Sequence, residues 1–296
     1  MTEKTFEFAQ LSTFPELSEQ TDLLVEEAFG YRSDCHFSAD FAPLAGPHNF
    51  QNRHVLFDSV SKRVVAHIGC LPRLFCWHGE VIPVVLIGGI AVEEEARGKG
   101  YFKEMFLRVL ALYHSQCAMF LLWRDKHDLY AKYDFYLAGR QWCYRAPGDS
   151  RGQMTSFKAL SVEKQEEMRR LYQKTVNQKC FSPLRDADDW SHIKDICSAE
   201  LFLLEEQNRL QGYYFRNKGM DLEGIVHDWA HEEGVTGLLR DAGNPGVIWA
   251  AENVPVADEV LQDLQLVGLW RLNTHPMALK KLSLLLDGAH VEWPDP

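Results

Sequence analysis

The sequence lacks the hallmarks of membrane and secreted proteins. No stretch reaches the roughly 18 apolar residues of a membrane span, because Pro83 and the Gly88-Gly89 pair interrupt the longest run, Val81–Val92. The first ten residues, MTEKTFEFAQ, do not show the basic-then-apolar order of a signal peptide. We therefore expect a cytoplasmic protein with no membrane partner.

The number and spacing of the cysteines argue against disulfides and metal sites. The 7 cysteines are odd in number, scattered along the chain and never spaced CxxC. In a chain of 296 residues this pattern favours reduced core thiols over a disulfide framework or a zinc site. We expect no metal cofactor.

Positive charge is scarce, with 31 Lys and Arg against 42 Asp and Glu, which gives a formal net charge of −11. Binding to nucleic acid requires a concentrated basic surface, so we expect no nucleic-acid partner. The charge mildly favours a cationic small substrate or peptide, but the need for solubility explains it equally well. The sequence leaves open whether the chain forms a homo-oligomer.

The chain does contain enough apolar material for a large core, because 46% of its residues are hydrophobic. Its length exceeds one average domain of roughly 100–200 residues. Residues 146–156 combine Pro, Gly and Ser without an apolar run, which predicts a linker. A similar order of elements on both sides predicts two units of one fold, over residues 1–150 and 151–296.

Hydrophobic periodicity gives a coarse secondary structure for each half. In the first half we expect strands at 6–8, 54–57, 63–77, 81–92, 118–123, 135–137 and 141–145. We also expect a helix opened by a capping box at Thr13 and Glu16 and stopped by Gly30, an irregular stretch at 31–52, a helix after Gly98 and a short helix at 128–133. In the second half we expect helices at 161–176, 187–196 and 277–286, and strands at 201–205, 210–216, 222–229 and 247–251.

The most informative segment is Ile87–Phe102, which reads IGGIAVEEEARGKGYF. It predicts a buried strand, an acidic turn, a loop of glycine and basic residues, and then a helix. A loop that opens a helix presents unpaired N–H groups at the positive end of the helix, which is a ready anion site. Gly98 and Gly100 allow the backbone to approach a phosphate, and Arg97 and Lys99 add positive charge.

A single Gly-x-Gly is weak evidence, because a turn between a strand and a helix also uses glycine for its dihedral angles alone. The Rossmann fingerprint GxGxxG is absent, and no Gly-Lys-Ser/Thr follows as a Walker loop requires.

The stretch Arg97-Gly-Lys-Gly100-Tyr-Phe102 resembles motif A of the GNAT acetyltransferases, whose loop reads Arg/Gln-x-x-Gly-x-Gly/Ala. The match extends through the second glycine. It departs at Phe102, where a bulky residue also occurs in the enhanced-intracellular-survival type of acetyltransferase. A second stretch, Leu129-Tyr-Ala-Lys-Tyr-Asp-Phe135, resembles the family's Leu-Tyr-x-Lys-x-Gly-Phe, with Asp134 in place of the glycine.

The resemblance implies an α+β fold with a mixed, mainly antiparallel sheet flanked by helices, in two GNAT-like units. It implies acetyl-CoA as co-substrate and a small amine, amino sugar or peptide amine as acceptor. Tyr130 would be the general acid that protonates the departing thiolate, although the residue could instead only pack its helix. The candidate coenzyme-binding residues are Ile90 and Val92 on the strand, where the pantetheine arm would pair as an added strand, and Arg97, Gly98, Lys99, Gly100, Tyr101 and Phe102.

Other interpretations remain open at this point. The chain could be a sensor module that binds acyl-CoA without catalysis, or it could transfer another acyl or aminoacyl group. No general base can be named, because Val84–Ile87, where some relatives carry a carboxylate, is wholly apolar. The second half has no Arg-x-x-Gly-x-Gly after its strand at 222–229 and instead reads AHEEGVTG, so we expect a degenerate unit there.

Overall fold

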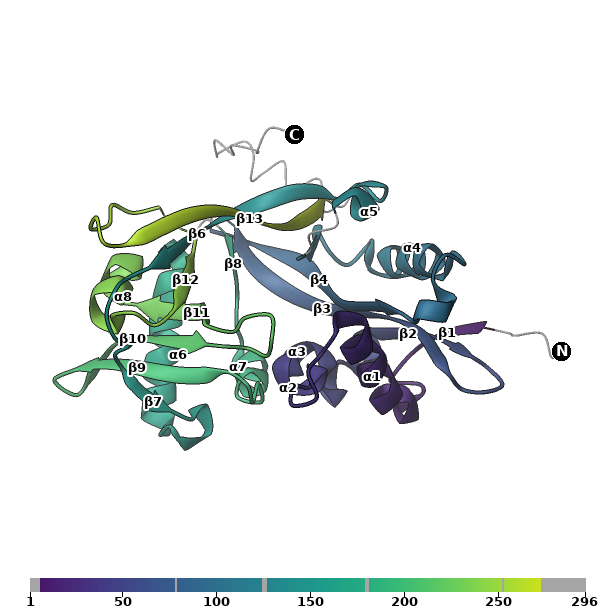
Figure 1. The fold of residues 1–296 in the computed structure, drawn as a ribbon, viewed down its shortest axis with the longest axis horizontal. Helices are drawn as coiled ribbons and strands as arrows, with labels where there is room; N and C mark the ends of the chain where they lie inside the picture. Colours follow the sequence, from purple (N-terminus) through teal and green to yellow (C-terminus); the bar gives the residue numbers. More distant parts are fainter. Residues whose placement is uncertain (1–5, 78, 124–126, 179–180, 252, 273–296) are drawn as a thin grey trace.

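The structure is a computed structural model that describes residues 6–272, apart from residues 78, 124–126, 179–180 and 252 (Figure 1). The helix expected at 277–286 lies outside the described residues. The strands are β1 (Phe6–Gln10), β2 (Arg53–Asp58), β3 (Val64–Trp77), β4 (Glu80–Val92), β5 (Met119–Leu122), β6 (Tyr136–Arg145), β7 (Gln153–Thr155), β8 (Phe181–Pro183), β9 (Glu200–Glu206), β10 (Arg209–Arg216), β11 (Ile225–His231), β12 (Val247–Ala250) and β13 (Leu261–Leu272).

Helices connect these strands on both faces of the sheet. The α-helices are α1 (Ser18–Phe29), α2 (Phe37–Asp40), α3 (Ala42–Ala45), α4 (Tyr101–Tyr113), α5 (His127–Ala131), α6 (Val162–Gln178), α7 (Ala187–Ile193) and α8 (Gly234–Ala242). Short 3₁₀ turns are η1 (Pro15–Leu17), η2 (Pro47–Asn52), η3 (Glu94–Ala96) and η4 (Phe157–Ala159).

The described strands form one continuous sheet in the order β1-β2-β3-β4-β5-β13-β6-β12-β11-β10-β9-β7, with β8 paired to β3. Most neighbours are antiparallel. The pairs β4–β5 and β11–β12 are parallel, and each is joined by a crossover helix, α4 or α8. The order is nearly symmetric about its centre. We call residues 6–150 the N-terminal half and residues 151–272 the C-terminal half.

The two halves exchange strands at the centre of the sheet. β6, from the N-terminal half, lies between β12 and β13. β13, from the C-terminal half, lies between β5 and β6. Each half therefore completes the sheet of the other, as the crossing ribbons above the centre of Figure 1 show. The division at residue 150 remains a prediction.

Each half packs helices on both faces of its own strands. In the N-terminal half, Phe106 and Val109 of α4 lie in one apolar cluster with Val85 and Ile87. The helices α1 to α3 contribute to another cluster on the opposite face. In the C-terminal half, α6 and α8 belong to two separate clusters in the same way. The apolar stripe of each helix thus finds its own side of the sheet.

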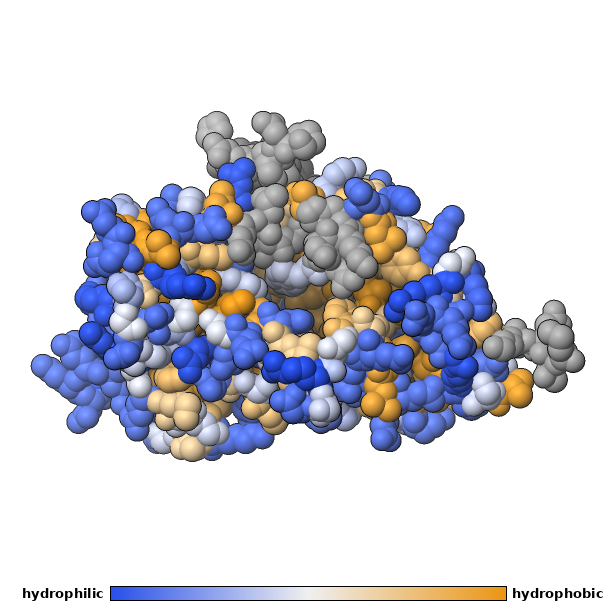
Figure 2. Space-filling model, viewed as in Figure 1, coloured by the Kyte–Doolittle hydropathy of each residue, from blue (hydrophilic) through white to orange (hydrophobic). Residues whose placement is uncertain are grey.

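The α+β class and the mixed, mainly antiparallel sheet predicted from the sequence are confirmed. Among the described residues, no helix combines the length and apolar character needed to cross a membrane. Figure 2 shows a largely polar face with scattered apolar side chains and a hollow near its middle.

Several local predictions need correction. The capping box at Thr13 and Glu16 does not form, because η1 precedes α1 and α1 starts without a side-chain cap. Residues 31–52 are not irregular throughout but contain α2, α3 and η2. The two strands expected at 135–137 and 141–145 are one continuous strand, β6. β13 was not predicted at all. Gly30 does end α1 as expected, with a φ of 68°.

Candidate functional site

The glycine-containing loop lies between η3 and α4, as predicted. Gly98 and Gly100 adopt the left-handed conformation, with φ of 76° and 85°, which is costly for any other residue. Among the described residues, no backbone or side-chain acceptor is recorded for the N–H groups of residues 98–103. A Cβ atom added at either glycine would meet no atom within 4 Å, so open space faces this backbone. These unpaired amides at the positive end of α4 form an anion cradle.

A cavity of about 490 Å³ opens against this loop. Its wall includes every predicted coenzyme-binding residue except Lys99, namely Ile90, Val92, Arg97, Gly98, Gly100, Tyr101 and Phe102. The predicted general acid, Tyr130, lines the same cavity. Residues 40 positions apart in the sequence thus meet at one site. Lys103 also lines it and adds a positive charge that the motif did not single out.

The edge of β4 beside the cavity is open because, among the described residues, its pairing with β5 stops at Leu86. The two parallel strands pair over Val84–Leu86 and Met119–Leu121. β4 then continues to Val92 with β3 as its recorded neighbour on one side only. The other edge, from Ile87 to Val92, offers backbone groups to an extended ligand arm. The fork between β4 and β5 is therefore where an added strand would enter.

A β-bulge at Gly89 interrupts the pairing of β4 with β3. The register with β3 shifts between His67 and Gly69, opposite this glycine. Gly89 has a φ of 58°, and a Cβ atom there would lie 2.9 Å from the ring of Phe37. Glycine is therefore required by both the backbone and the packing.

Two buried polar residues hold this bulge, and the sequence did not reveal their role. Arg53 and His67 are both 0% exposed. Arg53 Nε donates to His67 Nε2 at 3.2 Å, so the opposite ring nitrogen carries the proton and donates to the Gly89 carbonyl at 2.7 Å. Asp22 accepts from Arg53 Nη2 at 2.6 Å and balances its charge. This series of hydrogen bonds, from Asp22 through Arg53 and His67 to Gly89, fixes the strand edge that precedes Ile90.

Burial sets the protonation state of His67 in this series of hydrogen bonds. Burial lowers the pKa of His67 well below its usual value, and the Arg53 guanidinium lowers it further. The imidazole is therefore neutral at physiological pH, as its acceptor role toward Arg53 requires. A buried His and Arg within apolar strands could have been noted in the sequence, but nothing there indicates that they meet Gly89.

Tyr130 lies in α5 and is 3% exposed. Its ring packs between aromatic neighbours, with centroids 5.7 Å from Phe106 and 6.1 Å from both Phe102 and Phe135. The bulky Phe102, which departs from motif A, thus helps to position the predicted acid. The ring is held by packing while the residue still lines the cavity.

Arg97 is exposed and its guanidinium turns back toward the strand. Arg97 Nε donates to the Val92 carbonyl at 3.2 Å. This bond occupies one lone pair of a carbonyl that was predicted to meet the pantetheine arm. The lining of the cavity contains no carboxylate and no histidine among the described residues.

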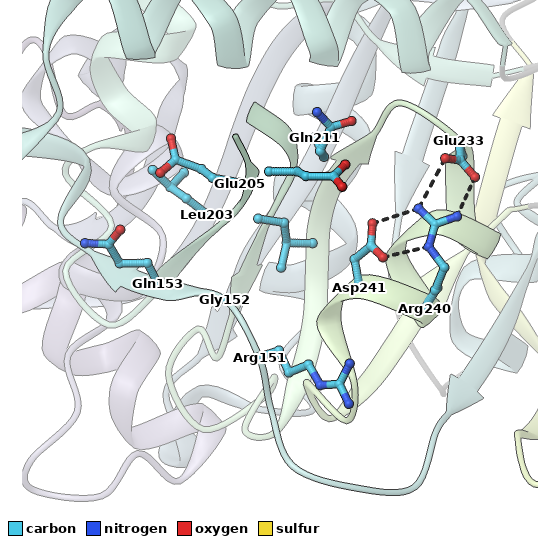
Figure 3. A pocket seen from close by; sticks show the side chains of 11 residues that line it. Arg151, Gly152, Gln153, Leu203, Glu205, Gln211, Glu233, Arg240 and Asp241 are labelled. Atoms are coloured by element: carbon cyan, nitrogen blue, oxygen red, sulfur yellow. Dashed lines mark hydrogen bonds and ion pairs between the residues drawn. The ribbon is translucent and has the colours of Figure 1, made fainter. Parts of the chain in front are cut away.

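The corresponding loop of the C-terminal half is built differently. β11 ends at His231 and α8 begins at Gly234, which leaves two residues between them. His231 is 1% exposed and accepts the Glu233 N–H at 3.1 Å, while its Nε2 donates to Asp241 at 3.0 Å. Arg240 joins Glu233 to Asp241, with bonds of 2.7 Å to each (Figure 3). The N–H group of Glu233 is therefore bonded within the protein.

A larger cavity of about 730 Å³ lies next to this second loop. Its wall carries the carboxylates of Glu205, Glu206, Glu233 and Asp241, together with Arg151 and Arg240 (Figure 3). Arg240 is already paired with two of these acids. The negative charge of these carboxylates disfavours binding of a pyrophosphate. Size alone thus does not identify the coenzyme site. Among the described residues, no cluster of His, Cys, Asp and Glu is arranged to hold a metal ion.

Residues 16–138 match the family model described as an acetyltransferase (GNAT) domain. The matched range spans the strand β4, the glycine loop, α4 and Tyr130. The predicted resemblance to the GNAT superfamily is confirmed for this part of the chain, and with it the class of acyltransferase. None of the curated proteins matches the chain.

Solved structures share the fold over most of the chain. A probable N-acyltransferase from Enterococcus faecalis is 14% identical, with a TM-score of 0.62 over 92% of this chain and 73% of that one. Eis1 from Mycobacterium abscessus is also 14% identical, with a TM-score of 0.59 over 91% and 73%. N-myristoyltransferase from Saccharomyces cerevisiae, solved with myristoyl-CoA, is 10% identical, with a TM-score of 0.55 over 80% and 69%. At these identities the likeness concerns the fold.

Proposed function

We propose that the chain is an acetyl-CoA-dependent N-acetyltransferase that transfers the acetyl group directly to an amine. The observation that carries this proposal is the single cavity that collects the cradle of free amides, the open edge of β4 and Tyr130. The pyrophosphate would lie against the amides of residues 98–102, and the pantetheine arm along Ile90 and Val92. The family match over residues 16–138 supports the same chemistry.

The reaction needs few groups from the protein. The lone pair of a neutral amine attacks the thioester carbonyl carbon, and the new N–C bond forms as the C–S bond breaks. The electron pair leaves with sulfur, and Tyr130 donates the proton that makes the free thiol. The amine nitrogen gives up one proton to water, and Tyr130 regains its own from solvent.

The packing beneath the fork favours a short acyl group. Val85 and Phe120 are 1% and 0% exposed and belong to the core cluster under α4. They pack on the α4 side of the sheet where β4 and β5 still pair, and the cavity beside the glycine loop does not extend to them. A long acyl chain would need a channel through this core. We therefore propose acetyl as the transferred group.

The proposal is tested by incubating the full chain with acetyl-CoA and a panel of amines while the release of free thiol is measured. The panel should contain polyamines, amino sugars, small amino acids and a peptide with a free amino terminus. We expect thiol release that depends on one class of amine. Tight binding of acetyl-CoA without turnover on any amine would instead favour a sensor module. Absence of binding would contradict the proposal altogether.

A further inference from the structure

A second cavity, of about 210 Å³, lies where the two halves meet. The N-terminal half contributes Leu71 from β3 and Leu86 from β4 to its wall. The C-terminal half contributes Phe215 from β10, His227 from β11 and Lys218 from the segment between them. Both halves are therefore needed to form it.

This cavity reaches the fork between β4 and β5 from the side opposite the coenzyme cavity. Leu86 is the last β4 residue that pairs with β5. Its side chain packs with Met119 and Leu121, whereas Val85 and Ile87 pack under α4. Since alternate residues of a strand point to opposite faces, Leu86 faces the side that carries α1 to α3. An acceptor held here would approach the fork from the face away from α4.

Most charges in the wall of this cavity neutralise one another. Arg73 pairs with Asp189 at 2.9 Å, and Arg185 pairs with Asp228 at 2.6 Å. His227 Nε2 contacts the Asn217 carbonyl at 2.8 Å, and burial lowers the pKa of His227 to about 4, so this ring is neutral at physiological pH. These groups give the wall no net charge.

Lys218 differs from the other charged residues of the wall. Among the described residues, no hydrogen bond or ion pair is recorded for its ammonium group. Its nitrogen lies 4.4 Å from the centre of the Phe41 ring, which holds the cation in place without neutralising it. Its N–H groups can therefore bind a ligand, while the carboxylates around it stabilise the charged form.

The surroundings keep Lys218 protonated. Burial lowers its pKa to about 8, while Asp228, Asp40 and Asp221 act in the opposite direction and Arg185 adds to the lowering. At neutral pH the ammonium form therefore predominates. Of these three carboxylates only Asp228 lines the cavity, and it pairs with Arg185, so Lys218 is the cation of the wall with no ion pair recorded among the described residues.

We propose that this cavity binds the amine acceptor, and that Lys218 selects acceptors that carry a carboxylate next to the amine. The volume corresponds to roughly seven water molecules at their share of the liquid volume, which suits a small amino acid. The carboxylate would bind Lys218 while the amine faces the fork at Leu86. This assignment rests on the proposed function and names its substrate class.

The test compares amines that differ only in the carboxylate. Thiol release is measured with alanine against ethylamine and with serine against ethanolamine, for the native chain and for Lys218→Met. Because each pair also differs in the pKa of the amine, the informative quantity is the change in the kcat/KM ratio between the two proteins. We expect Lys218→Met to reduce this ratio roughly 10- to 100-fold, as for loss of a hydrogen bond to a charged group. Lys218→Arg should restore part of it.

Controls separate this proposal from the one on which it rests. Lys194→Met removes an exposed lysine of the same half and should leave the ratio unchanged. Calorimetric titration with alanine tests the cavity without any turnover, and titration with acetyl-CoA tests the coenzyme site. Loss of alanine binding in Lys218→Met would support the cavity even if acetyl-CoA did not bind.

Two results would overturn the assignment. One is an unchanged kcat/KM ratio in Lys218→Met, in a protein whose melting temperature shows that it is folded. The other is failure of the native chain to bind alanine while it acetylates amines without a carboxylate equally well.

Discussion

The two halves of this protein share a topology but differ at the loop that leads into the crossover helix of each, α4 or α8. In the N-terminal half, the loop between β4 and α4 leaves its amides free and places two glycines in the left-handed region. In the C-terminal half, His231 takes the amide of Glu233, and Arg240 ties Glu233 to Asp241. The same position in the fold therefore carries basic residues beside the helix end in one half and the carboxylates of Glu233 and Asp241 in the other.

The difference shows that the fold alone does not set the charge around the start of the crossover helix. Both helices present a positive amino-terminal end. The loop sequence decides which charges surround the free N–H groups there. This difference supports the proposal that the N-terminal half binds the coenzyme while the C-terminal half completes the sheet and the acceptor side.

The largest expected effect comes from substituting the loop glycines of the two halves. Gly100→Val and Gly234→Val impose similar backbone strain, because φ is 85° and 64° and no atom lies within 4 Å of an added Cβ. Gly100→Val should weaken acetyl-CoA binding roughly 100-fold or more through loss of the amide cradle. Gly234→Val should leave the affinity unchanged. Calorimetry measures the affinity of both variants for acetyl-CoA. An equal loss of affinity in the two variants would contradict the difference between the halves.

The next effect concerns turnover. Tyr130→Phe removes one hydroxyl and keeps the ring contacts with Phe102 and Phe106. We expect kcat to fall toward the low end of the roughly 10²–10⁴-fold range of general acids, since a thiolate leaves fairly well unaided. KM should stay nearly constant. Steady-state kinetics check this, with Tyr133→Phe as the nearly silent control. Full activity in both variants would make Tyr130 a packing residue.

A matched pair of buried histidines sharpens the comparison further. His67→Leu and His231→Leu each leave hydrogen-bonding groups unsatisfied, so each should lower the free energy of unfolding by about 1–3 kcal/mol. The Gly89 bulge loses its support in the first variant alone. We therefore expect a higher Kd for acetyl-CoA in His67→Leu and an unchanged Kd in His231→Leu. Urea unfolding and calorimetry separate the two effects. A similar Kd in both variants would remove the positioning role of His67.

The smallest effect is a pH dependence that both halves share. Burial lowers the pKa of His54 and of His227 to about 4 in the folded protein, against roughly 6.5 when unfolded. The unfolded chain takes up protons first as the pH falls, so stability decreases between about pH 6.5 and 4. From pH 7.5 to 6 we expect a loss below about 1 kcal/mol per histidine. Urea unfolding at both pH values measures it, and His54→Gln should lessen the loss. A gain in stability on acidification would contradict the assignment.

Local sequence signals predicted the positions of the glycine loop and of α4. The glycines at 98 and 100 and the apolar stripe from Phe102 to Tyr113 fall where the loop and α4 lie. The prediction of Tyr130 relied on a second motif, and the structure brings it to the same cavity. Short-range patterns suffice there because a loop followed by a helix is defined by neighbouring residues.

Features that depend on distant contacts were not predictable. β13 pairs with β5 and β6, more than 110 residues earlier in the chain, and its own sequence shows no clear alternation. The series of hydrogen bonds from Asp22 through Arg53 and His67 to Gly89 joins four separate elements. The cavity around Lys218 exists only because β10 and β11 lie beside β3 and β4. No local sequence pattern predicts these contacts between distant residues.

The number of acetyl-CoA molecules bound per chain is the most direct test of the difference between the halves. Calorimetric titration of the full chain should give one site, with micromolar affinity and a binding free energy of about −8 kcal/mol. Gly100→Val should abolish that site and Gly234→Val should preserve it. Two equivalent sites per chain, or a single site lost with Gly234→Val, would contradict the account.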